Sequence, residues 1–194
     1  ASDARVKPLL KGRLDDNLFT SGSVRVGAGA GVGAKAWSFV YKAAAEIGEL
    51  GDNTRAMRQA VAGDALLRLL VSQPGARLSV LGHTRWASVG IISEANAHPV
   101  NSEEIEVDTA MPYLVSALNG DVDNHADIKV RNGLKIAEPI TTDAKVIPTV
   151  VARKNAAGAD LVSAFRQTVG EFDGSVAIAT ASADEPNKVL LALR

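Results

Sequence analysis

Strand-like and helix-like segments occur in pairs along this chain, and that order limits the folds available to it. The strand-like runs lie at 23–26, 37–41, 78–81, 113–118, 175–180 and 188–193, and the helix-like runs lie at 43–50, 54–72, 124–133, 142–154 and 160–169. Paired strands and paired helices favour antiparallel sheets covered by helices over a doubly wound parallel sheet. The sequence therefore predicts a layered α+β domain.

Two helices carry more specific expectations. Apolar residues between Thr54 and Ser72 recur near helical spacing, with Gly63 as a weak point, and this pattern predicts a core-facing helix or helix pair. Asp160 stands directly before another amphipathic segment, where its carboxylate can accept hydrogen bonds from the first free N–H groups. We expect Asp160 to cap that helix.

The composition is that of a globular domain and excludes several functions. The 194 residues are 46% hydrophobic and 22% charged, enough to bury a core without cross-links. Lys and Arg number 21 against 22 Asp and Glu, so the net charge of −1 offers no basic field to nucleic acid or an anionic membrane. No apolar run reaches the roughly 18–20 residues that cross a bilayer. The absence of cysteine excludes disulfides, thiolate metal sites and a cysteine nucleophile within these residues.

The two ends of the sequence suggest a piece of a longer protein. The chain opens with Ala1-Ser2-Asp3 rather than Met, and it stops in an apolar run at 188–194 that no turn closes. We therefore expect an excised segment, with no signal peptide or membrane span.

Three patterns that resemble ion-binding motifs do not meet the requirements of those motifs. Glycines at every second position of 27–33 fit neither a dinucleotide-binding loop nor a P-loop, and they indicate a flexible loop. Asp121, Asp123 and His125 alternate like calcium ligands, but Ala126 stands where that loop requires glycine. The three histidines lack zinc-ligand spacing. We expect no metal site.

Two polar segments at the ends of apolar strands are the candidates for chemistry. Arg85 offers a planar fork of donors to a carboxylate, with Trp86 beside it as an apolar wall. The alternative is a surface arginine beside a half-buried tryptophan. Asn119-Gly120 is either a plain turn or an oxyanion site, in which the Asn amide and the next N–H converge on a negative oxygen. The residues alone leave both alternatives open.

Four motifs occur together and in order in the rest of the chain. They are Gly-His-Thr-Arg-Trp-Ala-Ser-Val-Gly at 82–90, Asn-Ala-His-Pro at 96–99, Val-Ser-Ala-Leu-Asn-Gly at 115–120 and Thr-Asp-Ala-Lys-Val-Ile at 142–147. This set resembles the glutaminase domain, a class II glutamine amidotransferase, of the glucosamine-6-phosphate synthases, or glutamine–fructose-6-phosphate aminotransferases. The resemblance is clear over 78–194, whereas 1–75 is divergent or carries an insertion, as in an actinobacterial-type branch. We expect a single type-2 amidotransferase-like domain over 1–194.

The resemblance implies a fold and a set of roles. The fold is that of an N-terminal-nucleophile hydrolase, an αββα layered sandwich with antiparallel sheets, incomplete in this segment. The implied catalytic residues are the oxyanion-hole pair Asn119 and Gly120. The implied substrate-binding residues are Arg85 and Ser88 for the α-carboxylate of glutamine, Asp143 for its α-ammonium, and Trp86 at the mouth of the ammonia route.

The resemblance also implies an activity and partners. The domain would release ammonia from L-glutamine for a sugar-phosphate isomerase domain of the same protein, which aminates fructose 6-phosphate to glucosamine 6-phosphate. No metal or organic cofactor is implied, and a cytoplasmic location and a homodimer are further expectations. The catalytic N-terminal cysteine would lie outside these 194 residues, so this chain alone is expected to be inactive. The alternatives are a catalytically inactive binding or structural module of the same fold, and an unrelated α+β domain.

Overall fold

The computed structural model describes residues 4–14, 18–28, 35–44, 51–84, 89–107 and 111–194. The helices and strands of the N-terminal part are α1 (Val6–Leu10), β1 (Val24–Ala28), β2 (Lys35–Phe39), α2 (Asp52–Gly63) and α3 (Ala65–Val71). Those of the C-terminal part are β3 (Val100–Asn101), β4 (Leu114–Gly120), α4 (His125–Arg131), the 3-10 helix η1 (Asp143–Lys145), α5 (Val146–Ala156), α6 (Leu161–Gly170), β5 (Val176–Ser182) and β6 (Val189–Leu193).

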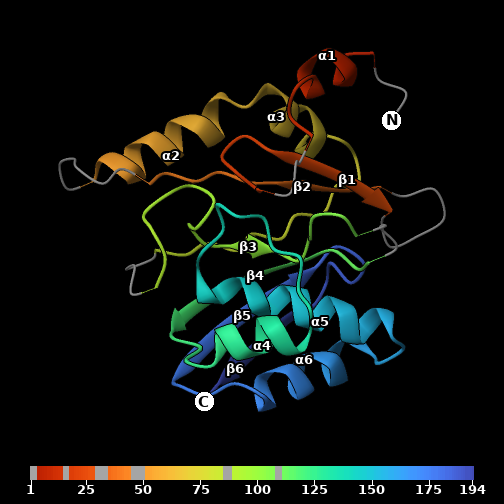
Figure 1. Ribbon diagram of the computed structural model, residues 1–194. Helices are drawn as coiled ribbons and strands as arrows, with labels where there is room; N and C mark the ends of the chain where they lie inside the picture. Colours follow the sequence, from red (N-terminus) through yellow and green to blue (C-terminus); the bar gives the residue numbers. More distant parts are fainter. Residues whose placement is uncertain (1–3, 15–17, 29–34, 45–50, 85–88, 108–110) are drawn as a thin grey trace.

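These elements form layers, with two antiparallel sheets between helices (Figure 1). Helices α1, α2 and α3 lie above the β1–β2 hairpin, and below it lies a four-stranded sheet in the order β3-β4-β5-β6. Every pairing in both sheets is antiparallel. Helices α4, α5 and α6 cover the outer face of the larger sheet. The layered α+β architecture that the sequence predicts is confirmed.

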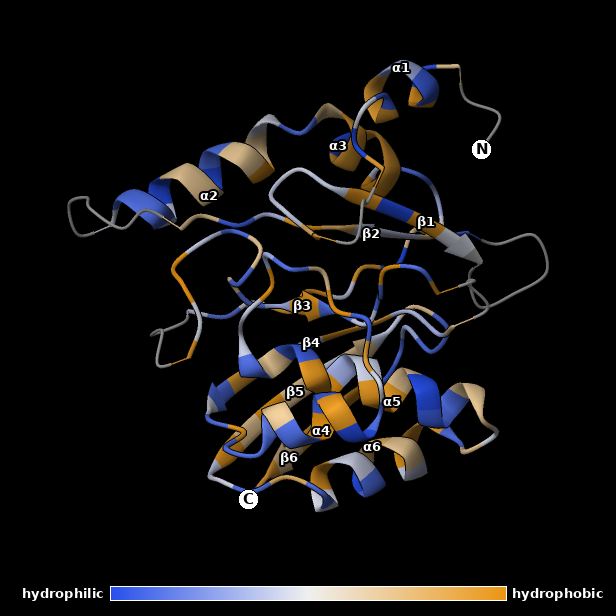
Figure 2. Cartoon of the chain, in the orientation of Figure 1, coloured by the Kyte–Doolittle hydropathy of each residue, from blue (hydrophilic) through white to orange (hydrophobic). Residues whose placement is uncertain are grey.

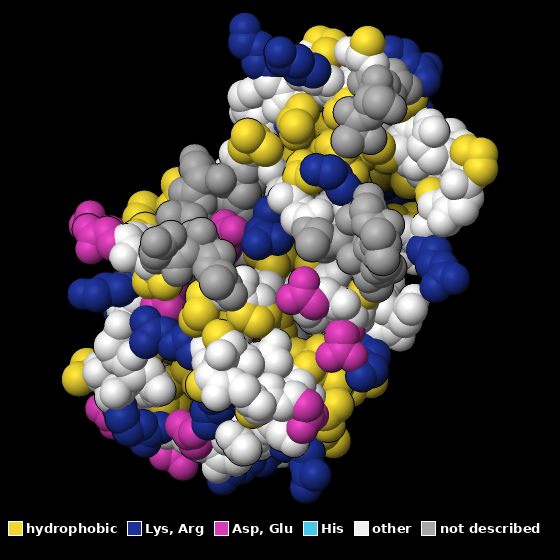
Figure 3. Space-filling model, turned by 90° about the vertical axis from the view of Figure 1, so that its right-hand side faces the viewer, with side chains coloured by type: hydrophobic (Ala, Val, Ile, Leu, Met, Phe, Trp, Pro, Cys, Tyr) yellow, Lys and Arg dark blue, Asp and Glu magenta, His cyan; other side chains and the backbone are white. Residues whose placement is uncertain are grey.

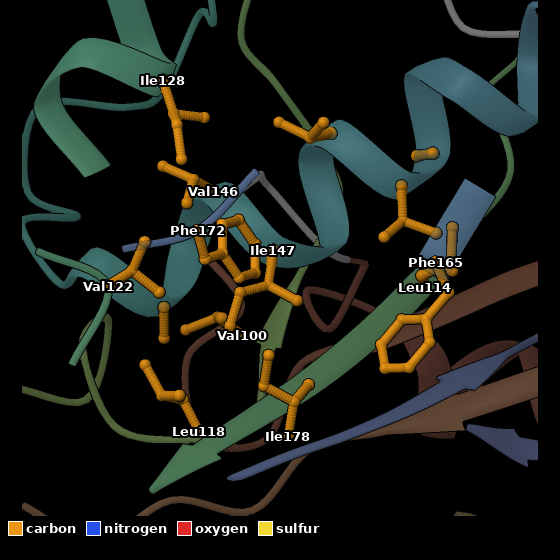
Figure 4. Close-up of a cluster of buried hydrophobic side chains, with 14 of the residues drawn as sticks. Val100, Leu114, Leu118, Val122, Ile128, Val146, Ile147, Phe165, Phe172 and Ile178 are labelled. Atoms are coloured by element: carbon orange, nitrogen blue, oxygen red, sulfur yellow. The ribbon is translucent and has the colours of Figure 1, made fainter. Parts of the chain in front are cut away.

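The main core lies between the larger sheet and helices α4–α6 (Figures 2 and 4). Alternate residues of β4 and β5 point into it, as the twofold period of a strand requires. Helix α5 is buried along its first seven residues, and Asp160 caps α6 as expected, with its carboxylate accepting from the N–H groups of Val162 and Ser163. The ten labelled core side chains are Val100, Leu114, Leu118, Val122, Ile128, Val146, Ile147, Phe165, Phe172 and Ile178.

The N-terminal layer has its own small core, and the core-facing helix or helix pair expected at 54–72 forms as a pair, of which only one member faces that core. The chain breaks at Asp64 into two helices, of which α3 buries Leu66 against β1 while α2 buries none of its residues. Met57 and Val61 on α2 are more than one-third exposed. The extended backbone of Asp64 redirects the chain, so the two helices cannot both pack on one sheet.

A polar and aromatic contact joins the two sheets. The Arg25 guanidinium on β1 lies 4.0 Å from the ring centre of Tyr113 and donates to Glu103 Oε1 at 2.9 Å. Phe19 meets the same tyrosine edge to face, at 6.2 Å between ring centres. A cation over an aromatic face gains more as water is excluded, so this contact anchors the hairpin layer on the larger sheet.

The predicted strand at 78–81 is not formed. Leu78 and Val80 are exposed, and the segment runs beside the β5–β6 turn, where Ser79 Oγ donates to the Pro186 carbonyl at 2.9 Å. Strand-like composition alone does not supply a partner strand, and this segment has none among the described residues.

The surface carries mixed charge. On the face shown in Figure 3, Lys and Arg side chains are interspersed with Asp and Glu rather than gathered in one field. No helix in the described part of the chain is long and apolar enough to cross a membrane.

Asp64 organises the N-terminal layer. Its carboxylate accepts two hydrogen bonds from Arg13, one from the Tyr41 hydroxyl at 2.7 Å and two from the first N–H groups of α3. Burial by itself would raise the pKa of Asp64, but the hydrogen bonds from Arg13, from backbone N–H and from Tyr41 together lower it well below its ordinary value. Burial and the same carboxylate raise the pKa of Tyr41.

We expect Asp64→Asn to lower the free energy of unfolding at neutral pH by about 2 kcal/mol, because the variant loses a charged acceptor. The depressed pKa makes this stabilisation complete above about pH 4 and lost progressively as the pH falls below that value. Urea denaturation as a function of pH should therefore show wild type and variant converging in acid. Asp52→Asn, which removes an exposed carboxylate paired with Arg55, is the matched control and should show almost no difference. A gap independent of pH would contradict the assignment.

Candidate functional site

The segment Asn119-Gly120 ends the central strand of the larger sheet. It is part of β4 rather than a turn after it, since Asn119 pairs with Ala177 and Gly120 with Val176. Asn119 is exposed, and its side chain makes no hydrogen bond to any residue that the structure describes. Its amide is therefore free to bind a ligand at the end of the strand.

Gly120 is required by the geometry at this point. Its φ is +105°, and a Cβ placed there would lie 1.9 Å from the carbonyl oxygen of Ser175. Only glycine accommodates both the conformation and the close approach of the two backbones. The close packing holds the end of β4 rigidly against the start of β5.

Backbone N–H groups after Asn119 alternate between two sides of the strand. On one side, the N–H groups of Asp121 and Asp123 donate to the carbonyls of Ser175 and Asp173, each at 3.0 Å. These bonds extend the β4–β5 pairing beyond the last residue of β4. The N–H groups of the intervening residues therefore point away from β5.

The N–H groups on the side away from β5 belong to Leu118, Gly120 and Val122, and the first and last of them have acceptors. Leu118 donates to Nδ1 of His98 at 3.3 Å, and Val122 donates to Oδ2 of Asp143 at 2.8 Å. Gly120 lies between these two donors, and the pairing pattern leaves its N–H without an acceptor among the described residues. A backbone N–H and an Asn amide are the kinds of donor that an oxyanion site uses.

Asp143 is a buried carboxylate at the start of η1. Oδ2 accepts from Val122 and Oδ1 from the Thr142 hydroxyl at 3.3 Å, which leaves acceptor capacity on both oxygens. Within the described ranges, Asp143 has no ion-pair partner, although it is only 4% exposed. Three residues of extended chain span at most about 11 Å, so the Val122 N–H that binds Asp143 lies within that distance of Asn119.

Arg85, Trp86 and Ser88, the other residues predicted to bind substrate, lie outside the described residues. The segments on either side of them are tied to the site. The His83 ring contacts the His98 ring with 5.0 Å between centres. On the other flank, Gly90 packs on the backbone of Thr141 and Thr142, so closely that a Cβ would lie 3.0 Å from the Thr142 nitrogen. The described residues on either side of 85–88 therefore contact His98, which binds the Leu118 N–H, and the two threonines that precede Asp143.

Sequence reasoning missed two residues of this arrangement. Asn96 accepts from the N–H groups just before Asp143, and His98 accepts from the N–H just before Asn119. The signal was available in the Asn-Ala-His-Pro motif, but spacing does not show which backbone groups such side chains bind. The described residues contain no group of three or more side chains arranged to hold a metal.

The comparisons with known proteins agree with the motifs. No family model matches the chain. Three curated relatives are glutamine–fructose-6-phosphate aminotransferases (isomerizing). The protein from Nostoc sp. (strain PCC 9229) is 36% identical over 120 residues, or 57% of this chain and 18% of that protein. That from Bacillus thuringiensis subsp. konkukian (strain 97-27) is 31% identical over 128 residues, or 66% and 20%. That from Xanthomonas campestris pv. campestris is 35% identical over 121 residues, or 62% and 18%.

These matches confirm that the chain resembles the glutamine–fructose-6-phosphate aminotransferases. The chain spans about a fifth of the length of those relatives. Among solved structures, the glutamine phosphoribosylpyrophosphate amidotransferase from B. subtilis, complexed with ADP and GMP, matches 57% of this chain and 22% of its own. Its TM-score is 0.44 and its sequence identity 18%.

We expect Gly120→Ala to lower the free energy of unfolding by more than about 3 kcal/mol, because the new methyl overlaps the Ser175 carbonyl. Gly133→Ala is the matched control: φ there is +57°, with nothing within 4 Å of the new Cβ. The control should cost about 1–2 kcal/mol, from left-handed backbone strain alone. Chemical denaturation of the two variants measures the difference, and equal losses would show that the close approach does not constrain the fold.

Proposed function

We propose that this chain is the glutamine-binding part of a glutaminase domain that releases ammonia from L-glutamine. In the whole protein the ammonia would aminate fructose 6-phosphate to glucosamine 6-phosphate on a sugar-phosphate isomerase domain. The proposal treats residues 1–194 as one type-2 amidotransferase-like domain of a cytoplasmic protein, with a homodimer as its assembly. The curated relatives, named for that overall reaction, support it.

The observation that carries the proposal is the buried Asp143 carboxylate close to a free oxyanion-type donor pair. A carboxylate removed from water requires a cation or several donors, and Asp143 has two neutral donors and no cation among the described residues. The α-ammonium of an amino acid would supply the missing charge. Asn119 and Gly120 lie two or three residues before Val122, whose N–H donates to Asp143. The Asn119 amide and the Gly120 N–H would face the side-chain amide of the substrate.

The proposed chemistry assigns each group one task. A nucleophile supplied from outside these 194 residues attacks the side-chain carbonyl carbon of glutamine, and the Asn119 amide and Gly120 N–H donate to the oxygen as it becomes negative. The carbon–nitrogen bond then breaks and ammonia leaves with a proton from the nucleophile or its base. Water releases glutamate in a second step. Asp143 and Arg85 hold the two charged ends of the amino acid and so fix the amide in place.

We expect Asp143→Asn to raise the dissociation constant for L-glutamine roughly 10- to 100-fold, because the ion pair with the α-ammonium is lost. The same variant should leave the affinity for 4-carbamoylbutanoate, which is glutamine without its α-amino group, within about threefold of wild type. Isothermal titration calorimetry measures both. Asp127→Asn, on the exposed face of α4, is the control. Equal weakening of both ligands would contradict the assigned role.

Arg85→Ala should abolish binding of both ligands, since each carries the carboxylate that this residue is proposed to hold. The two variants therefore have different signatures in the same calorimetric experiment. Wild-type protein that gives no heat with either ligand would contradict the proposed function itself.

The second candidate is a catalytically inactive module of the same fold. It is favoured by one observation, the absence of cysteine from all 194 residues. Both candidates predict glutamine binding, and neither predicts that the purified chain hydrolyses glutamine. Release of ammonia by the chain alone, in a coupled glutamate dehydrogenase assay, would contradict both. Activity of the full-length protein would distinguish them.

A further inference from the structure

Asn96 is completely buried, and its side chain uses its entire hydrogen-bonding capacity. Oδ1 accepts from the N–H groups of Thr141 at 2.7 Å and Thr142 at 2.9 Å. Nδ2 donates to Ser93 Oγ at 2.9 Å and to the Pro139 carbonyl at 3.1 Å. An amide has two donor and two acceptor positions, so none is left for a ligand. Asn96 therefore cannot bind substrate, and its bonds act on the protein alone.

These bonds determine where η1 begins. Thr141 and Thr142 immediately precede Asp143, and neither threonine side chain caps the short helix. The Asn96 oxygen binds both of their N–H groups at once, which fixes the plane of two successive peptides. The Thr142 hydroxyl then meets Oδ1 of Asp143. The position of the buried carboxylate thus depends on an acceptor that lies 45 and 46 residues before the two threonines it binds.

We propose that Asn96 is a positioning residue for Asp143, holding that carboxylate where it can bind the α-ammonium of the ligand. The inference rests on the proposed function. His98, two residues further on, accepts from the N–H of Leu118. The segment that contains Asn96 and His98 therefore positions the backbone on both sides of the Gly120 N–H. Asn96 acts on the side where Asp143 lies.

The first test compares two ligands on one variant. Asn96→Ala should weaken L-glutamine about tenfold and change the affinity for 4-carbamoylbutanoate less than about threefold, because only the first ligand uses Asp143. Thr168→Val is the matched control: Thr168 is also buried, and its hydroxyl donates to the Ala164 carbonyl within α6 rather than to the residues around η1. A merely structural role would weaken both ligands or neither. That result, in a variant whose folding is confirmed by circular dichroism, would overturn the proposal.

The second test needs no ligand. Asn96 does not touch Val122, whose N–H is held by Asp143, so displacement of the carboxylate should expose that amide. Hydrogen exchange measured by NMR should be more than about tenfold faster at Val122 in Asn96→Ala, with the Leu118 amide, held by His98, as the internal reference. Unchanged exchange at Val122 would overturn the proposal even if glutamine does not bind. Glutamine failing to bind the wild type would count against the proposed function alone.

A conservative variant covers the case in which Asn96→Ala does not fold. Asn96→Asp keeps the acceptor for Thr141 and Thr142 and exchanges the Nδ2 donor for a second carboxylate oxygen, which can accept from the Ser93 hydroxyl but faces the Pro139 carbonyl oxygen. It should retain glutamine affinity within about threefold and keep the Val122 amide protected. A folded Asn96→Asp protein that loses both would show that the acceptor is not what positions Asp143.

Discussion

The close approach of β4 to β5 at Gly120 is the constraint on which the site depends. Only a residue without a side chain lets the backbone pass the Ser175 carbonyl, and the chain after it continues the same alternation of N–H groups. That alternation points the N–H groups of Leu118 and Val122 to one side of the strand, where His98 and Asp143 accept hydrogen bonds from them. That the Gly120 N–H between them has no acceptor in the described part of the chain is therefore a consequence of sheet geometry.

The site is assembled from three segments that are far apart in the sequence. The end of β4 provides the donors, the start of η1 provides the buried carboxylate, and the segment at 93–99 binds the backbone of both. Each joint is a side chain accepting from a backbone N–H, which fixes position more tightly than an apolar contact does. Such a site is rigid because its supports are buried, and a rigid site loses little entropy when it binds a charged amino acid.

The N-terminal layer is held by different forces. Inside it, Arg13 and Tyr41 converge on Asp64, while its attachment to the larger sheet relies on Arg25 over Tyr113 and on Phe19. Two sequence predictions differ from the structure, one in part and one entirely. A core-facing helix or helix pair was expected at 54–72, and of the pair that forms only α3 packs on the hairpin. The strand at 78–81 has the right composition but no neighbour to pair with.

The sequence by itself determined the α+β layering, the cap at Asp160 and the motifs that resemble amidotransferases, because periodicity, capping residues and motif order are local properties. Only the tertiary structure decided that Asn119-Gly120 belongs to the strand, that Asp143 is buried without a cation among the described residues, and that Asn96 and His98 hold the two halves of the site. Those facts depend on which backbone N–H meets which side chain across 20 to 46 residues, and no spacing in the sequence records such a pairing.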